Sequence, residues 1–113
     1  MLQSSLPPDV EGERLFDALG SPVRRQILRD LGSAALSVGE LSASFSISRP
    51  AISRHLAVLE EAGLVQHIAE GTRNVYRLNT AGFERTSQWL AQFWDDAEAR
   101  LRLVAENLPR PTP

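Results

Sequence analysis

The apolar positions near the start of the chain predict two short helices. The first covers residues 11–19, and the second begins after Ser21 and ends before Gly32. Serine before a helix and glycine after it are common boundary residues. A hydroxyl can accept from a free amide, and glycine tolerates the conformation that ends a helix. Each helix carries apolar residues on one side, at helical spacing. They are Leu15, Phe16 and Leu19 in the first, and Val23, Ile27, Leu28 and Leu31 in the second.

Three arginines line the outer side of the second helix: Arg24, Arg25 and Arg29. We interpret them as solvated or paired with nearby acids, with a phosphate contact by one of them as the alternative. The segment 33–36 then connects to the next helix. Leu36 is expected to form a strand of one or two residues beside a later hairpin.

A longer pattern runs from Ser37 to Val65 and predicts a helix, a tight turn, a second helix and the start of a strand. Ser37 and Glu40 have the spacing of a capping box, in which each side chain bonds the other residue's backbone amide. Three apolar residues follow at helical spacing and predict one buried stripe. They are Val38, Leu41 and Phe45.

The second helix of this motif is predicted over residues 49–62. Ser48 is placed to cap it, Pro50 lies in its first turn, and Gly63 ends it. Its inner face is formed by apolar residues, namely Ile52, Leu56 and Leu59.

The charges on this helix favour a function in binding. Arg49, Ser53 and Arg54 lie near its N-terminus, whereas Glu60 and Glu61 lie at its far end. This order opposes the helix dipole, which favours acids at the N-terminus and cations at the C-terminus. A helix-turn-helix inserts the N-terminal end of its second helix into the DNA major groove. The alternative is an ordinary helical hairpin with solvated arginines.

Two short strands follow, over residues 65–70 and 72–78, with Glu70 and Gly71 supplying the turn. In the second strand one face carries Tyr76 and Leu78, and the other carries Arg73, Val75 and Arg77. A hairpin of this kind after a recognition helix is the wing of a winged helix. Arg73 would then reach the sugar-phosphate backbone or the minor groove. The alternative is a hairpin that only covers the core.

The last predicted helix covers residues 81–107 and carries a heptad-like apolar seam: Leu90, Trp94, Ala97, Leu101, Val104 and Leu108. Trp89 and Phe93 widen this stripe beyond what so small a domain can cover. A second copy related by a two-fold axis is the simplest partner, and the first helix is expected to join that interface. The alternative is that the helix packs back on its own domain. Residues 1–10 and 108–113 are predicted to be flexible tails flanking one domain over 11–107.

Composition limits the chemistry of the 113-residue chain. Cysteine is absent and only two histidines occur, which excludes disulfides, thiolate metal sites and a multi-histidine metal site within one chain. The net charge is −2, but the block 49–77 carries four arginines against three glutamates. No secretory signal or membrane-length apolar run is evident, so we expect a cytoplasmic protein. We find no acid–base pair or phosphate-binding glycine loop and expect no enzyme.

The order of these elements resembles the ArsR-type winged-helix repressors of bacteria over nearly the whole chain. The resemblance is carried by FDALGSPVRRQILRDL, VGELSASFSISRPAISRHLAVLEEAGLV and EGTRNVYRLN. It implies a mainly α fold with a small β-hairpin, in the order α-α-α-α-β-β-α, and a homodimer that represses transcription from a palindromic operator. It places near DNA the positions Ser48, Arg49, Pro50, Ser53, Arg54 and His55, with Arg73 and Arg77 on the wing. His55 has a second interpretation, since it lies near the inner face and could pack there.

The chain departs from the metal sensors of that family. Their cysteine pair would fall on Ser42 and Ser44, and the last helix carries Asp95, Asp96 and Glu98 without histidine. Hydroxyls are poor ligands for thiophilic metals, and carboxylates alone would bind hard ions weakly. The sequence therefore resembles the metal-independent branch, with no metal site and no cofactor.

The leading hypothesis is a DNA-binding repressor that acts as a homodimer, released by an unknown small-molecule or protein inducer. The alternative is a winged-helix protein-interaction module without specific DNA binding. The residues expected at the dimer interface come from the first and last helices. They are Leu15, Phe16, Leu19, Trp89, Leu90, Phe93, Trp94, Ala97, Leu101 and Val104.

Overall fold

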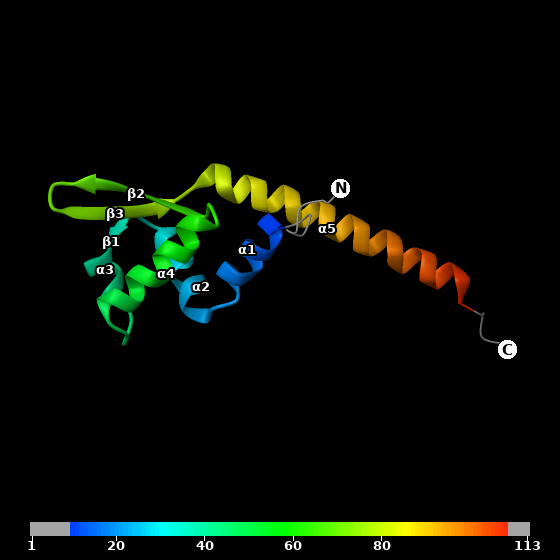
Figure 1. The fold of residues 1–113 in the computed structure, drawn as a ribbon, viewed down its shortest axis with the longest axis horizontal. Helices are drawn as coiled ribbons and strands as arrows, with labels where there is room; N and C mark the ends of the chain where they lie inside the picture. Colours follow the sequence, from blue (N-terminus) through cyan, green and yellow to red (C-terminus); the bar gives the residue numbers. More distant parts are fainter. Residues whose placement is uncertain (1–9, 109–113) are drawn as a thin grey trace, which may run out of the picture.

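The computed structural model describes residues 10–108, which form one winged domain and a long projecting helix (Figure 1). The elements are α1 (Val10–Leu19), α2 (Pro22–Leu31), β1 (Leu36–Ser37), α3 (Val38–Ser42), α4 (Arg49–Glu61), β2 (Val65–Glu70), β3 (Arg73–Leu78) and α5 (Thr80–Asn107). The predicted order of helices and strands is confirmed, and so is the short strand at Leu36. The predicted tails lie almost entirely outside the described residues.

The serine caps are where the sequence places them. The Ser21 hydroxyl accepts from the Arg24 amide at 3.3 Å, and the Ser48 hydroxyl accepts from the Ala51 amide at 3.3 Å. At the start of α3 the capping box is complete: the Ser37 amide donates to Glu40 Oε1 at 2.8 Å, and the Glu40 amide donates to Ser37 Oγ at 3.2 Å. These local bonds explain why the N-termini of α2, α3 and α4 could be predicted.

The predicted helical stripe that includes Phe45 is wrong, because α3 has five residues and ends at Ser42. The Ser42 hydroxyl donates to the Val38 carbonyl at 2.8 Å, and the Phe45 amide turns back to the Ser42 carbonyl at 3.1 Å. Serine side chains compete with the helical ladder in this way. The turn therefore begins before Phe45, whose ring still packs against the core from outside the helix.

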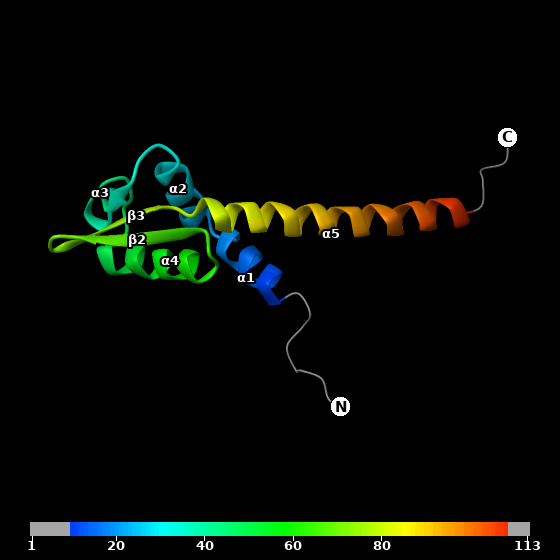
Figure 2. The same cartoon turned by 90° about the horizontal axis from the view of Figure 1, so that it is seen from above.

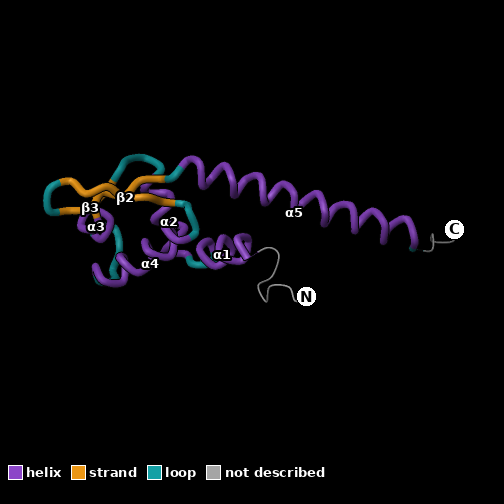
Figure 3. Tube along the Cα trace, turned by 45° about the horizontal axis from the view of Figure 1, so that its top comes forward, coloured by secondary structure: helices purple, strands orange, loops and turns teal. Residues whose placement is uncertain are grey.

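The sheet has the order β1-β3-β2 and is antiparallel throughout. Its two long strands, β2 and β3, lie side by side in Figure 3. Glu70 pairs with Arg73, so the turn consists of Gly71 and Thr72, one residue later than predicted. Gly71 has φ +64°, as the first central residue of a type II′ turn requires. A second glycine with positive φ lies just after α4, where Gly63 has φ +81°.

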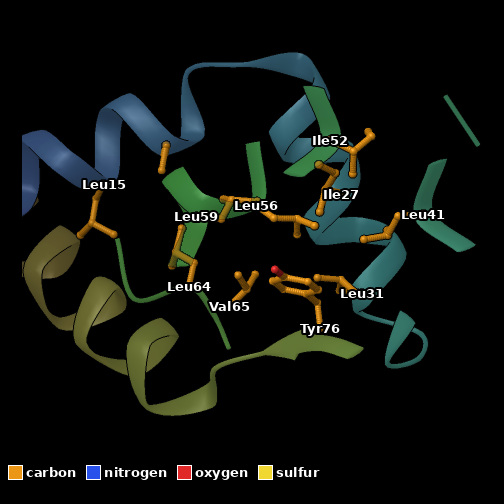
Figure 4. Close-up of a cluster of buried hydrophobic side chains, with 11 residues drawn as sticks. Leu15, Ile27, Leu31, Leu41, Ile52, Leu56, Leu59, Leu64, Val65 and Tyr76 are labelled. Atoms are coloured by element: carbon orange, nitrogen blue, oxygen red, sulfur yellow. The ribbon is translucent and has the colours of Figure 1, made fainter. Parts of the chain in front are cut away.

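The core lies between the helices and the hairpin (Figure 4). The predicted inner face of α4 is confirmed, since Ile52, Leu56 and Leu59 are fully buried. They pack with residues from the other elements, among them Ile27, Leu41, Leu64, Val65 and Tyr76.

The start of α5 sits directly on the loop that follows α4. A Cβ on Gly82 would lie 1.5 Å from the Gly63 carbonyl oxygen, so the two backbones touch. The Asn79 amide also donates to the Leu64 carbonyl at 2.9 Å. These contacts fix the direction in which α5 leaves the domain.

Arg24 ties α1 to α4, a role that the sequence did not reveal. Its Nε donates to the Ala18 carbonyl at 2.8 Å and its Nη2 to the Asp17 carbonyl at 2.6 Å. Its Nη1 lies 3.1 Å from His55 Nδ1. Arg25 likewise donates to the end of α1, at 2.7 Å from the Leu19 carbonyl. These two arginines therefore cap the C-terminus of α1. Arg25 is also exposed to solvent, as predicted, whereas no ion pair with an acid involves either arginine within residues 10–108.

The contact with Arg24 settles the protonation of His55. A guanidinium can only donate, so Nδ1 accepts and the proton of the neutral ring is on Nε2. Burial lowers the pKa of His55 below its usual 6.5, and the charges of Arg24 and Arg54 lower it further. His55 is consequently neutral in the folded protein at pH values where the unfolded chain protonates it.

We expect the free energy of unfolding to fall as the pH drops through the window just below 6.5. In that window His55 is protonated in the unfolded chain but stays neutral in the folded protein, so protonation stabilises the unfolded state. Urea denaturation at a series of pH values measures this. His55→Gln should flatten the dependence in that window. An unchanged pH profile in His55→Gln would contradict the assignment.

Candidate nucleic-acid interface

The N-terminal end of α4 presents most of the predicted DNA-contacting residues to solvent. Five of these residues are exposed: Ser48, Arg49, Pro50, Ser53 and Arg54. They lie on the side of the helix away from the core, because the opposite side is buried. His55 is half-buried and bonded to Arg24, so it stands apart from this group. The structure thus gives His55 a part in orienting α4.

The wing lies at the same end of the molecule as the start of α4, opposite the free end of α5 (Figure 2). Arg73 and Arg77 are both exposed on β3. Arg73 directly follows the turn, whereas Arg77 pairs with Gln66 nearer the base of the hairpin. The helix and the wing can therefore face one elongated partner together.

A contact that the sequence analysis missed holds the hairpin to α4. His67 on β2 places Nδ1 2.7 Å from Glu60 Oε2, and its ring lies 5.1 Å from that of Tyr76. Burial raises the pKa of the Tyr76 phenol, and the charge of Glu60 raises it further. The wing is therefore fastened near the C-terminal end of α4, which limits how it can tilt relative to the helix.

A hollow of about 440 Å³ opens where α3, α4 and the wing meet. Its lining includes Glu40, Arg49 and Arg73. Arg73 Nη1 lies 3.8 Å from Glu40 Oε1. The pKa of Glu40 is lowered, first by the Ser37 amide, then by the Ser37 hydroxyl, with a smaller contribution from Arg73. The carboxylate is thus charged at neutral pH, and the oxygen that accepts from Ser37 in the capping box also faces Arg73 of the wing.

One side of the far part of α5 carries large apolar residues that nothing covers within the described chain. Trp94 is 65% exposed and Leu101 is 71% exposed. Nearer the domain, Phe16 of α1 packs edge-on against Trp89, with ring centroids 5.2 Å apart, and Trp89 stacks on Phe93 at 5.5 Å. The helix therefore packs back only at its start and then projects into solvent.

The residues predicted for the dimer interface fall into two groups. Leu15 is 6% exposed and belongs to the core of the single chain, and Leu19 is half-buried against that core. These two residues offer little surface to a partner. Exposed or partly exposed residues make up the other group: Phe16, Trp89, Leu90, Phe93, Trp94, Ala97, Leu101 and Val104.

The acids of α5 show no arrangement for a metal ion. Asp95, Asp96 and Glu98 are exposed, and Glu98 pairs with Arg102 at 3.3 Å. Among residues 10–108 no cluster of three histidine or carboxylate side chains could hold an ion. In the same part of the chain, no helix combines the length and the apolarity needed to cross a membrane.

Comparison with known proteins agrees with this geometry. Residues 19–68 match the helix-turn-helix domain family. The chain is 41% identical to the HTH-type transcriptional regulator Rv2034 of Mycobacterium tuberculosis, over 75% of this chain and 79% of that protein. It is 33% identical to the transcriptional repressor SdpR of Bacillus subtilis, over 70% of this chain and 88% of that protein.

Solved structures share the fold. An ArsR-like transcriptional regulator from Rhodococcus sp. RHA1 superposes with a TM-score of 0.70 at 32% identity, over 88% of this chain and 94% of that one. The homodimeric winged helix-turn-helix domain of Mb0332 from Mycobacterium bovis, at 24% identity, has a TM-score of 0.61, over 88% of this chain and 94% of that one, and it supports the fold alone. The chain therefore belongs to the ArsR family of winged helix-turn-helix transcriptional regulators, which bind DNA.

Proposed function

We propose that the protein is a repressor that binds a palindromic operator as a homodimer. The observation that carries this proposal is the exposed arginine-bearing end of α4, held outward by its buried opposite face. In this arrangement Arg54 and Ser53 reach base edges in the major groove, and Arg73 and Arg77 approach the backbone from the wing. The repressor acts in the cytoplasm, where a bacterial operator lies.

The dimer forms through the exposed apolar side of α5. A continuous stripe of this kind is stable in water only when a partner covers it, and a second α5 carries the same stripe. A two-fold axis between the helices would place two copies of α4 about one DNA turn apart, near 34 Å. Phe16 and Trp89 join the interface where α1 meets α5.

Repression in this proposal does not depend on a metal. Serines stand where metal sensors carry their cysteine pair, and Ser42 donates its hydroxyl to the Val38 carbonyl. The exposed acids of α5 carry no histidine beside them. Release of DNA would then follow from a small molecule or a protein that changes how the two α5 helices pair.

Binding of a sequence selected from a random DNA pool tests the function. We expect the selected duplex to be palindromic and to bind at least about 10³-fold more tightly than random DNA, with steep weakening as salt rises. Gel-shift titrations at several salt concentrations measure both quantities. Equal affinity for the selected and random duplexes would reject the repressor and leave the protein-interaction module.

Arg54→Ala should weaken binding to the selected operator by about 1–3 kcal/mol, because it removes a contact with a base edge or a neighbouring phosphate. The dimer should stay intact, since Arg54 lies far from α5. Arg102→Ala on α5, at an exposed position outside the seam, is the matched control and should bind as the unmodified protein does. Fluorescence anisotropy with the operator gives the affinities, and loss of dimerisation in Arg54→Ala would contradict the assignment.

Leu101→Glu should convert the protein to monomers or aggregates by placing a charge in the seam. Leu103→Glu is the matched control, because Leu103 is also exposed, at 59%, but lies outside the seam. It should remain a dimer. Light scattering after size exclusion measures the mass, and a stable Leu101→Glu dimer would place the interface elsewhere.

A further inference from the structure

The hollow between α3, α4 and the wing is lined by two arginines from different elements and by one carboxylate. Arg49 begins α4, Arg73 begins β3, and Glu40 lies in the first turn of α3. We propose that this hollow binds a single phosphate of the DNA backbone between Arg49 and Arg73, and that Glu40 is the internal anion that this phosphate displaces. The inference rests on the proposed function and assigns a role within it to Glu40.

Glu40 is placed to hold Arg73 loosely in the free protein. Its Oε1 accepts from the Ser37 amide at 2.8 Å and lies 3.8 Å from Arg73 Nη1. A separation of 3.8 Å is too long for a good hydrogen bond. Both side chains are also about half exposed, at 57% for Arg73 and 49% for Glu40. Such a pair is weak and can be exchanged for a better anion at little cost.

The Arg49 side chain lines the same hollow and lies close to Gly39 of α3. A Cβ at that position would lie 3.1 Å from Arg49 Nη2, so the guanidinium rests over the first turn of α3. This position differs from that of Arg54, which lies about 1.4 turns further along α4 and so leaves the helix in another direction. Arg49 is therefore a phosphate contact, and Arg54 remains the residue for base edges.

A backbone phosphate binds the two guanidinium groups of the hollow better than the Glu40 carboxylate does. Guanidinium groups bind phosphate through paired N–H donors, and two of them from separate elements would fix its position. Glu40 meanwhile keeps its bond to the Ser37 amide, so displacement from Arg73 leaves the capping box intact. The wing would thus exchange an internal anion for an external one when DNA binds.

Glu40→Gln isolates this exchange. Glutamine preserves the capping box, because its side-chain oxygen still accepts from the Ser37 amide, but it removes the charge beside Arg73. We expect Glu40→Gln to bind a labelled random-sequence duplex of roughly 30 base pairs about two- to fivefold more tightly. Random DNA is the suitable probe because phosphate contacts carry no sequence information.

A double-mutant cycle with Arg73→Ala separates the exchange from a general charge effect. Arg73→Ala alone should weaken binding and reduce the salt slope by about one. Adding Glu40→Gln to Arg73→Ala should then give no further gain. Glu61→Gln makes the same charge change at the exposed far end of α4, away from the hollow, and should change affinity less than Glu40→Gln.

The outcomes are distinct. Tighter binding by Glu40→Gln that disappears without Arg73 supports the site. Unchanged affinity of Glu40→Gln, or an equal gain with and without Arg73, overturns it, provided that thermal melting shows each variant folded. The reduced salt slope of Arg73→Ala tests the phosphate contact independently, since that substitution leaves the capping box untouched. Failure of the unmodified protein to bind any duplex would instead reject the proposed function.

Discussion

The burial of one side of α4 is the constraint on which the rest of the structure depends. Ile52, Leu56 and Leu59 are fully buried, and each such side chain contributes about 1.5–3 kcal/mol. A helix that buries this stripe must turn its other side outward, and that side carries Arg49 and Arg54. Apolar burial therefore offsets the cost of placing cations at the positive end of the helix dipole.

Two polar contacts then fix the orientation of α4 on the core. His55 binds Arg24 beside the end of α1, and Glu60 binds His67 on β2. Apolar packing is not directional, whereas each of these bonds defines an angle. Together they make α1, α4 and the wing one unit, so that the helix and Arg73 keep their relative positions before DNA arrives.

Sequence reasoning succeeded where the signal is local. Caps at Ser21, Ser37 and Ser48 depend on residues within a few positions, and the buried stripe of α4 repeats at the helical period. It failed where a side chain bonds a group in another element. Arg24 has the pattern of a surface arginine, but the tight turn before α2 places it against the last carbonyls of α1. Phe45 has the spacing of a helix but follows a serine-rich stretch whose hydroxyls bond the backbone. The exposed arginines of the candidate site could be predicted from local patterns. The position of the Glu40 carboxylate beside Arg73 could not, because it depends on how α3 packs against the hairpin.

Aromatic packing and the hydrogen bonds of Arg24 connect the recognition helix α4 to the projecting helix α5. Trp89 of α5 packs on Phe16 of α1, and a Cβ at Gly12 would overlap the Trp89 ring, so α1 and α5 are in close contact. The other end of α1 presents its last carbonyls to Arg24, which in turn reaches His55 on α4. A dimer built on α5 therefore sets the spacing of two α4 helices through a short chain of packed and hydrogen-bonded groups. The start of α5 also rests directly on the loop after α4, at Gly63 and Gly82, so a change in the spacing of the two α4 helices in the proposed dimer would require movement at both contacts.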